Sequence, residues 1–242
     1  STNAYTTELG KLKIKYDTEK DQIISHSNKL ITVFDDEIED DPDMLREINF
    51  WQKEVEKIAS IPVFTSNKKL VRAYGKESNM GNLFADAVAA TDERIDVAVI
   101  NSGALRQDIE AGIVTKGDLI SAFPFPNTLV MTKLKGTQVR EIFNHAAGMT
   151  NGVLQISENS SYSFTPGEQV DEIWIKGELV ADEEEYWVAA PNFVTQGGDG
   201  YWEFQNSLEY IDTGVVIVDA VEDFIKGVEM YNPKYEGRIL VK

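Results

Sequence analysis

Hydrophobic and polar positions alternate in short runs between residues 10 and 34. Leu12, Ile14 and Tyr16 alternate with lysines, and a second apolar run follows a polar turn at residues 30–34. Successive side chains of a β-strand point to opposite faces, so a period of two is typical of strands. The pattern predicts a β-hairpin near the start of the chain.

A single long helix is predicted next. Asp41 can accept hydrogen bonds as its N-cap, and Pro42 suits the first helical position. Apolar residues then recur at a four-three-four-three spacing, as Met44, Ile48, Trp51, Val55 and Ile58. This spacing predicts an amphipathic helix, which Ser60 and Pro62 end. We interpret the acidic residues 35–43 as a solvated connection, because they lack the spacing of an EF-hand calcium loop.

The chain after residue 60 mixes helical and strand periods. Helices are predicted at residues 80–88, 139–146 and 216–226, and strands at residues 96–101, 128–135, 170–176 and 186–190. The last helix should turn Ile217, Val221, Phe224 and Ile225 inward and end at Gly227. These elements predict an α+β fold, with helices packed on a mixed sheet and preceded by the β-hairpin and the long linker helix. We therefore divide the chain into a preceding piece, residues 1–60, and a domain formed by residues 61–242.

Composition and charge exclude several classes of partner and site. Of the 242 residues, 23 are Lys or Arg and 41 are Asp or Glu, which gives a formal net charge of -18. Nucleic acid is therefore not an expected partner, because its phosphate backbone needs a basic surface. The sequence has neither a long apolar run nor a basic start followed by an apolar stretch, so neither a membrane span nor a signal peptide is expected. The absence of cysteine excludes disulfides and Cys-ligated zinc.

Histidine is the most informative single count. The chain has two, His26 and His145, whereas two-metal hydrolytic centres usually combine several imidazoles with carboxylates. No metal site is therefore expected in this chain. Neither histidine adjoins a nucleophile motif such as G-x-S-x-G, although sequence order alone leaves a Ser-His-Asp triad open. We interpret both histidines as surface or hydrogen-bonded structural residues.

A loop of small residues follows the buried strand predicted at residues 96–101. It reads Asn-Ser-Gly-Ala-Leu-Arg over residues 101–106, and small side chains let a ligand approach the backbone. Arg106 offers a fixed fork of donors to an anion. The same arginine could instead pair with Asp108 or another acidic residue at the surface.

Two further loops supply aromatic rings and a carboxylate. Residues 123–127 place two phenylalanines between prolines, either as a ligand platform or as part of the core. Residues 191–201 place Asp199 among three glycines, where a carboxylate can accept hydrogen bonds from the vicinal hydroxyls of a sugar, or where it is simply an exposed turn residue. Together the three loops provide what a nucleotide needs, namely aromatic faces, hydrogen-bond acceptors and positive charge.

Four motifs occur in order along residues 65–242: Glu77-Ser78-Asn79-Met80-Gly81-Asn82-Leu83, Asn101 to Arg106, Pro124-Phe125, and Pro191 to Tyr201. In order and approximate spacing they resemble the C-terminal domain of the 5'-nucleotidase and UDP-sugar hydrolase family. Residues 5–60 resemble the last strands of that family's N-terminal metallophosphoesterase domain, followed by the helix that links the two domains.

The resemblance implies a substrate-binding role. Enzymes of the family hydrolyse phosphate esters of nucleosides with two divalent metal ions and an Asp-His pair, all in the N-terminal domain, and they rotate the C-terminal domain to carry the substrate to the metals. The metal-ligand motifs of that domain are absent from this sequence. The chain alone is therefore expected to bind a nucleotide or nucleoside without cleaving it, to hold no catalytic residue and no cofactor, and to work with the missing domain.

The resemblance also implies individual roles. Phe125 and Phe193 would sandwich the base, Asn101 would contact it, Asp199 would bind the ribose hydroxyls, and Arg106 would help to hold ribose or phosphate. Gly198, in the same loop as Asp199, is also expected to contact the substrate. Further candidates for substrate contact are Arg72, Lys76, Asn79 and Asn192.

The sequence departs from the family pattern at several positions. The family usually has Asn-Gly-Gly-Gly-Ile-Arg at residues 101–106 and Gly at the position of Pro126, so the backbone angles of both loops can differ. A second family arginine normally precedes the Asn-Met-Gly motif, and Tyr74 stands at that spacing. Arg72 or Lys76 could take its role only if the loop is shifted.

The leading hypothesis is the substrate-specificity domain of a 5'-nucleotidase. One alternative is the same domain of a 2',3'-cyclic-nucleotide 2'-phosphodiesterase with 3'-nucleotidase activity. The other is a non-catalytic binding or adhesion module, in which Phe125 and Phe193 would face the core rather than each other. The resemblance alone implies an extracellular, cell-wall-associated or periplasmic location.

Overall fold

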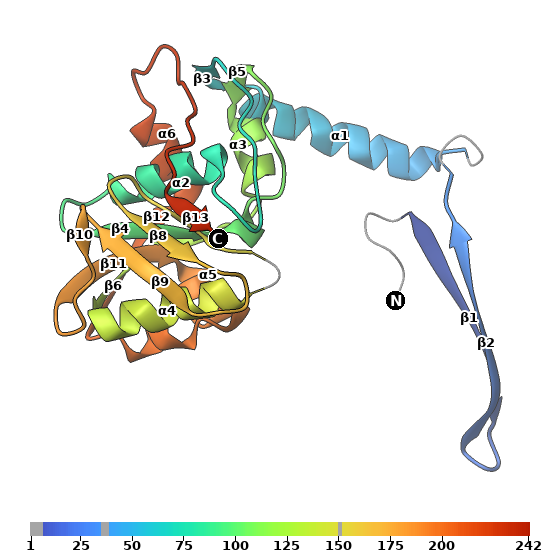
Figure 1. The fold of residues 1–242 in the computed structure, drawn as a ribbon. Coiled ribbons are helices and arrows are strands. Elements are labelled where there is room, and N and C mark those ends of the chain that lie inside the picture. Colours follow the sequence, from blue (N-terminus) through green and yellow to red (C-terminus); the bar gives the residue numbers. More distant parts are fainter. Residues whose placement is uncertain (1–6, 35–38, 150–151) are drawn as a thin grey trace. The chain divides into compact units, whose positions relative to one another are not determined.

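The computed structural model describes residues 7–34, 39–149 and 152–242 (Figure 1). The chain divides into two compact units, Ser1–Glu54 and Val55–Lys242. Residues 35–38, which belong to the acidic stretch interpreted as a solvated connection, lie outside the described residues. The division of the chain at residue 60 into a preceding piece and a domain stays a prediction.

The first unit contains the predicted hairpin and the start of the predicted helix. Strand β1 (Glu8–Asp17) pairs antiparallel with β2 (Gln22–Thr32). Helix α1 (Pro42–Ala59) begins as the sequence indicates, because Oδ1 of Asp41 accepts hydrogen bonds from the backbone N–H groups of Asp43 (2.9 Å) and Met44 (3.0 Å). The apolar residues of its predicted face are exposed.

A five-stranded mixed sheet lies at the centre of the second unit, within the described residues, in the order β12-β6-β11-β4-β7. Strands β11 and β4 are parallel, and the other neighbours are antiparallel. The strands are β4 (Val97–Asn101), β6 (Thr128–Lys135), β7 (Leu154–Ile156), β11 (Glu185–Pro191) and β12 (Glu209–Val216). The strands predicted at residues 96–101, 128–135 and 186–190 are thus confirmed.

Shorter strands extend the second unit. A second sheet has the order β10-β9-β8-β13, in which β8 and β13 are parallel, and β3 pairs antiparallel with β5. Of these strands the sequence predicted β9 alone. Their bounds are β3 (Pro62–Ser66), β5 (Gly112–Thr115), β8 (Ser161–Phe164), β9 (Val170–Ile175), β10 (Glu178–Leu179) and β13 (Ile239–Val241).

Helices cover both faces of the central sheet, as the alternation of β4 shows. Ala98 and Ile100 pack into the core shared with α2 (Asn79–Ala89), α3 (Lys116–Ala122) and α6 (Ile217–Phe224). Val97 and Val99 pack into the core shared with α4 (Gly136–Gly148) and the second sheet. A strand buried on both faces reads as a continuous apolar run, as this one does. The predicted α+β fold, with helices on a mixed sheet, is confirmed.

The face of the last helix differs from the prediction. Ile217, Val221 and Ile225 are buried as expected, but Phe224 is 39% exposed. Val218 is buried as well, so the apolar stripe is rotated toward Val218 and leaves Phe224 at its edge. The helix ends at Phe224, two residues before the predicted end, and Gly227, the predicted stop, adopts a left-handed φ of 85°.

Candidate functional site

Asn101 is the last residue of β4, at the carboxyl end of the buried strand. A short 3-10 helix, η1 (Ser102–Ala104), follows, and the backbone N–H of Leu105 donates to the carbonyl of Ser102 (3.2 Å) at its end. The backbone N–H of Ser102 donates to the carbonyl of Val153 (3.0 Å) and so anchors the start of this turn. Asn101 is 6% exposed, whereas Arg106 is exposed. The strand therefore fixes the amide, and the turn carries the guanidinium toward solvent.

The two phenylalanines of residues 123–127 have different surroundings. Phe123 is buried and stacks on Phe84, with ring centroids 5.5 Å apart, so it belongs to the core. Phe125 is half-buried and meets Phe123 edge-on at 6.2 Å. The guanidinium carbon of Arg106 lies 5.3 Å from the centroid of the Phe125 ring, which is cation–π geometry. The loop thus contributes one ring to the core and one ring to a second environment.

Glycines allow the chain to turn sharply after the short helix α5 (Asn192–Thr195). Gly197 has a φ of 91° and Asp199 a φ of 54°, so the helical turn η2 (Gly198–Gly200) includes a left-handed residue. A Cβ on Gly198 would lie 2.4 Å from the backbone oxygen of Phe193 and 2.6 Å from its ring. Glycine at this position therefore lets the Phe193 ring and the Asp199 carboxylate share one tight loop.

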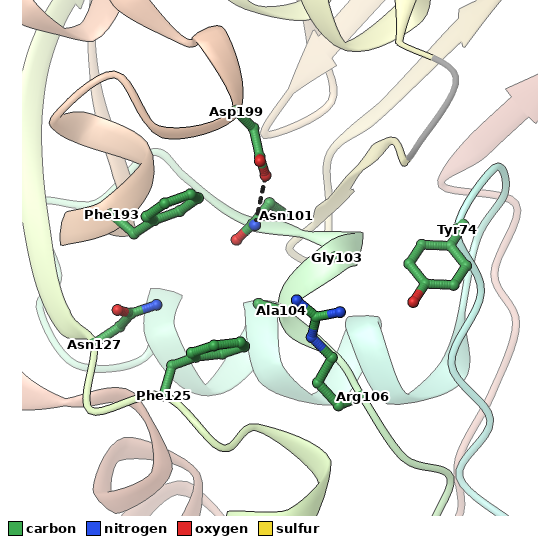
Figure 2. A pocket seen from close by; sticks show the side chains of 9 residues that line it. All are labelled: Tyr74, Asn101, Gly103, Ala104, Arg106, Phe125, Asn127, Phe193 and Asp199. Atoms are coloured by element: carbon green, nitrogen blue, oxygen red, sulfur yellow. Dashed lines mark hydrogen bonds between the residues drawn. The ribbon is translucent and has the colours of Figure 1, made fainter. Parts of the chain in front are cut away.

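The three loops meet around one cavity of about 590 Å³. Figure 2 shows the Phe193 ring above the Phe125 ring with a gap between them, Asn101 and Asp199 along one edge, and Arg106 next to Phe125. The volume is within the range of pockets that enclose small organic ligands. The lining residues are Tyr74, Asn101, Gly103, Ala104, Arg106, Phe125, Asn127, Phe193 and Asp199.

The side-chain amide of Asn101 links strand β4 to the glycine-rich loop of residues 197–200. Its Nδ2 donates a hydrogen bond to Oδ2 of Asp199 at 3.1 Å. Its Oδ1 is buried and has no hydrogen-bond partner among the described residues. A buried acceptor without a donor is costly, so this oxygen is suited to accept a hydrogen bond from a ligand.

Arg106 is not paired with Asp108, the partner that the surface interpretation named first. Asp108 instead lies 3.4 Å from Nζ of Lys69 and accepts a hydrogen bond from the backbone N–H of Arg72 at 3.0 Å. Within the described residues, no carboxylate forms a salt bridge with Arg106. Its charge is therefore open to an anion in the cavity.

His145, in the last turn of α4, contacts the glycine-rich loop of residues 197–200 from outside the cavity. Its Nε2 donates to the backbone oxygen of Asp199 at 2.8 Å, and its ring meets that of Tyr201 edge-on at 4.7 Å. Burial, with the charge of Asp199 as a second cause, raises the pKa of Tyr201 above its ordinary value and keeps its phenol neutral. His145 is thus the hydrogen-bonded structural residue that the sequence suggested.

The further candidates lie outside the lining of this cavity. Asn79 is 4% exposed and holds the backbone of its own region, since its Oδ1 accepts from Val71 N (2.7 Å) and its Nδ2 donates to the carbonyl of Lys69 (3.0 Å). Oδ1 of Asn192 accepts a hydrogen bond from the backbone N–H of Phe193 at 2.9 Å. Lys76 and Arg72 remain beside the site: Lys76 is exposed, and the guanidinium of Arg72 lies 5.0 Å from the centroid of the Tyr74 ring.

Sequence reasoning missed two side chains that line the cavity, Tyr74 and Asn127. Asn127 ends the aromatic loop that the sequence singled out, so a signal was present. Tyr74 was noted only as standing at the position of a family arginine, and no local pattern indicates that its ring faces the cavity.

Metal ligands are not grouped in the described part of the chain. No set of three or more His, Asp or Glu side chains there has the geometry to hold an ion. The donors in the described residues thus do not fit a two-metal centre. No helix among the described residues has the length and apolar character of a membrane span.

Known proteins share both the sequence pattern and the fold. Residues 57–206 match the family described as 5'-nucleotidase, C-terminal domain. The chain is 29% identical over 259 residues to the trifunctional nucleotide phosphoesterase protein YfkN of Bacillus subtilis, covering 97% of this chain and 17% of that protein. It is 28% identical over 270 residues to human 5'-nucleotidase, covering 98% of this chain and 46% of that protein. It therefore spans about half or less of these curated relatives.

Solved structures support the fold alone. The chain superposes on a 5'-nucleotidase precursor from Thermus thermophilus with a TM-score of 0.78 at 24% identity, over 97% of this chain and 50% of that one. It also superposes on the NAD nucleotidase of Haemophilus influenzae with a TM-score of 0.68 at 18% identity, over 99% of this chain and 54% of that one. Because the family match covers more than half of the chain, the conclusion is plain: the chain belongs to the family of 5'-nucleotidase C-terminal domains.

Proposed function

We propose that the second unit binds the nucleoside part of a nucleotide in the cavity between Phe125 and Phe193. The observation that carries the proposal is the meeting of these two rings, an unpaired amide oxygen, a carboxylate and a cation from three separate loops around one cavity. A binding module without a ligand pocket would have both rings in the core. Instead Phe193 is 44% exposed and Phe125 is half-buried at the cavity wall.

Each group has a role that follows from its chemistry. The flat faces of the two phenyl rings suit a planar base, since stacking on an aromatic ring is favourable for any base. The free Oδ1 of Asn101 can accept a hydrogen bond from an exocyclic amino group. Asp199 has one carboxylate oxygen engaged by Asn101, and the second oxygen is available to ribose hydroxyls. Arg106 holds the phosphate by charge-assisted hydrogen bonds.

We further propose that the parent protein is a hydrolase in which a preceding two-metal domain cleaves the phosphate ester. This chain would supply binding and specificity, with no catalytic residue of its own. The support is the family match and the names of the relatives, which include human 5'-nucleotidase. A 2',3'-cyclic-nucleotide phosphodiesterase would use the same binding unit, so product analysis of the metal-loaded full-length enzyme has to separate the two activities. The extracellular, cell-wall-associated or periplasmic location stays a prediction that cell fractionation can test.

Calorimetric titration of the 242-residue chain tests the binding role. AMP, adenosine, UMP and UDP-glucose are titrated into the unaltered chain and into Phe193→Ala, with Phe50→Ala as control because Phe50 is also an exposed ring, on α1. The Phe193 variant should lose roughly tenfold or more in affinity for the base that binds, since stacking contributes about 1–3 kcal/mol per base. The control should leave affinity unchanged. Equal affinity in Phe193→Ala and the unaltered chain contradicts the aromatic slot, and no binding of any of the four compounds favours the adhesion module.

A further inference from the structure

A second cavity lies at one end of the four-stranded sheet β10-β9-β8-β13 (Figure 1). Strands β8 and β13 begin there and β9 ends there, because β9 runs antiparallel to β8 and β13 runs parallel to it. The cavity has a volume of about 320 Å³, at the lower end of the range for pockets that hold small organic ligands. It shares no lining residue with the cavity of Phe125 and Phe193, so it offers a separate place for a ligand.

An exposed aromatic ring forms part of the lining. Trp174 lies between Ile173 and Ile175 on β9, and because side chains alternate along a strand, the isoleucines are buried while the indole is 39% exposed. Its Nε1 donates a hydrogen bond to Oε2 of Glu172 at 3.1 Å. This N–H lies in the plane of the indole, so the bond holds the ring without covering its faces. Such a face suits a ligand with a flat surface of C–H groups, because the negative face of an aromatic ring attracts them.

A buried hydroxyl in the lining has no partner. Ser160 is 5% exposed, and its Oγ forms no hydrogen bond within the described residues. The turn that carries it is fixed, since the carbonyl of Asn159 accepts a hydrogen bond from the backbone N–H of Gly177 at 3.0 Å. A buried polar group without a partner is costly, so this hydroxyl is suited to form a hydrogen bond with a hydroxyl of a ligand.

The charges of the lining cancel. Its charged residues are Glu236 and Arg238, and Oε2 of Glu236 accepts hydrogen bonds from Nε (2.9 Å) and Nη2 (2.6 Å) of Arg238. The other N–H groups of the guanidinium donate to the carboxylate of Asp86 (2.6 and 2.9 Å) and to the carbonyl of Ile156 (3.0 Å). An anion would therefore find no free donor on Arg238, and the lining has no net negative charge to attract a cation. Both facts favour an uncharged ligand.

We propose that this second cavity binds one neutral sugar ring of an oligosaccharide. The flat C–H face of the sugar lies on the Trp174 indole, and one of its hydroxyls forms a hydrogen bond with Ser160. Another hydroxyl donates to Oε1 of Glu236, the carboxylate oxygen that Arg238 does not use. The second unit would thus hold a carbohydrate at the end of the four-stranded sheet, in addition to the nucleoside in the first cavity.

NMR titration of the isotope-labelled 242-residue chain tests the proposal. The probes are maltotriose, cellotriose, mannotriose and the trisaccharide of N-acetylglucosamine, with choline as a cationic and glucuronate as an anionic comparison. The readout is the indole N–H signal of Trp174, which is identified by its absence from the spectrum of Trp174→Ala. Ser160→Ala removes the unpartnered hydroxyl. Trp202→Ala is the control, because Trp202 is an exposed indole outside the lining.

At least one trisaccharide should shift the Trp174 signal and bind more tightly than choline and glucuronate. Trp174→Ala and Ser160→Ala should each weaken its binding roughly two- to tenfold, the loss expected of one stacking contact or one hydrogen bond, as followed by the backbone signals that shift. Trp202→Ala should bind like the unaltered chain.

Urea denaturation separates binding from folding. Ser160→Ala should keep the urea midpoint of the unaltered chain, because the hydroxyl that it removes has no partner in the folded protein. A Trp174 signal that none of the four trisaccharides moves overturns the proposal. Tighter binding of choline or glucuronate, or full trisaccharide affinity in Trp174→Ala or Ser160→Ala, overturns it as well.

Discussion

Nε2 of His145 donates a hydrogen bond to the backbone carbonyl of Asp199 at 2.8 Å, and this contact joins helix α4 to the loop that presents the carboxylate. Asp199 is held in a left-handed conformation with a φ of 54°, which costs free energy for a residue other than glycine. The imidazole and the hydrogen bond from Asn101 are two contacts that compensate this cost. The position of the carboxylate therefore depends on a residue outside the cavity lining.

His145→Ala should weaken nucleoside binding by roughly fivefold, the effect of one lost hydrogen bond of about 1 kcal/mol on the placement of Asp199. His145→Gln should recover part of the affinity, because its amide can donate to the same carbonyl. His26→Ala is the control, since it replaces the other histidine of the chain, in the first unit. Calorimetry with adenosine measures all three. A His145→Ala variant with unaltered affinity would show that the loop keeps its shape without the imidazole.

Arg106→Gln should separate phosphate binding from nucleoside binding. The guanidinium has no carboxylate partner among the described residues, so its charge is available to a ligand phosphate. AMP affinity should fall about tenfold, while adenosine affinity changes little. Arg46→Gln, an exposed arginine on α1, is the matched control. An equal loss for AMP and adenosine would mean that Arg106 acts through its contact with the Phe125 ring instead.

Glu77 should be among the most sensitive positions for stability. Its buried carboxylate accepts hydrogen bonds from the backbone N–H groups of Glu236 (2.6 Å), Gly237 (2.8 Å) and Arg238 (3.2 Å), and so fastens the C-terminal segment to the start of α2. Glu77→Ala leaves these donors without a partner and should lower the free energy of unfolding by about 3 kcal/mol.

Urea denaturation followed by circular dichroism measures the Glu77 effect. Glu77→Gln should be milder, because the amide oxygen still accepts. The exposed Glu93→Ala should change the free energy of unfolding by less than about 0.5 kcal/mol. A Glu77→Ala variant as stable as Glu93→Ala would be incompatible with this role.

Ionisation of the Tyr231 phenol should lower the stability of the folded protein at alkaline pH. Burial, with the nearby charge of Asp86 as a second cause, raises the pKa of Tyr231 to about 12 from its ordinary value of 10.0. The folded state therefore holds this proton more tightly than the unfolded state does. The resulting stability is complete below pH 10 and is lost as the pH rises from 10 through 12.

The Tyr231→Phe variant should lose less stability between pH 9 and pH 11 than the unaltered chain, because it lacks the phenol that titrates in this range. Urea denaturation at both pH values gives the comparison. Tyr235→Phe, at an exposed tyrosine, should behave like the unaltered chain. Identical pH dependence in all three proteins would argue that Tyr231 does not contribute.

The parts of the fold that the sequence predicted are those with long, regular periods. Helices α1, α2 and α4 and strand β4 follow from apolar spacing alone, because each has a regular apolar stripe or a continuous apolar run in its sequence. The short strands β3, β5 and β10 were missed, since they are short and, unlike β4, have no continuous apolar run that distinguishes a strand from a loop. Their pairing depends on partners far away in the sequence.

The candidate site was predictable to the extent that its residues lie at the ends of regular elements. Asn101 and Arg106 follow a strand that the apolar run identifies, and the glycine-rich composition around Asp199 indicates a tight turn. Composition could not tell Phe123 from Phe125, because the two rings are separated by tertiary packing against Phe84. For the same reason nothing local indicated that Tyr74 would face the cavity.

The cavity draws its walls from positions as distant as Tyr74 and Asp199, and the central strands β4, β6, β7 and β11 lie between these two residues in the sequence. A fragment shorter than residues 74–199 lacks part of this lining, so nucleotide binding requires that segments far apart in the sequence have folded together. Ligand binding then opposes unfolding by mass action, and the melting temperature should rise with ligand concentration. Thermal melting in the presence of a compound library would thus rank ligands for this protein without any assay of hydrolysis.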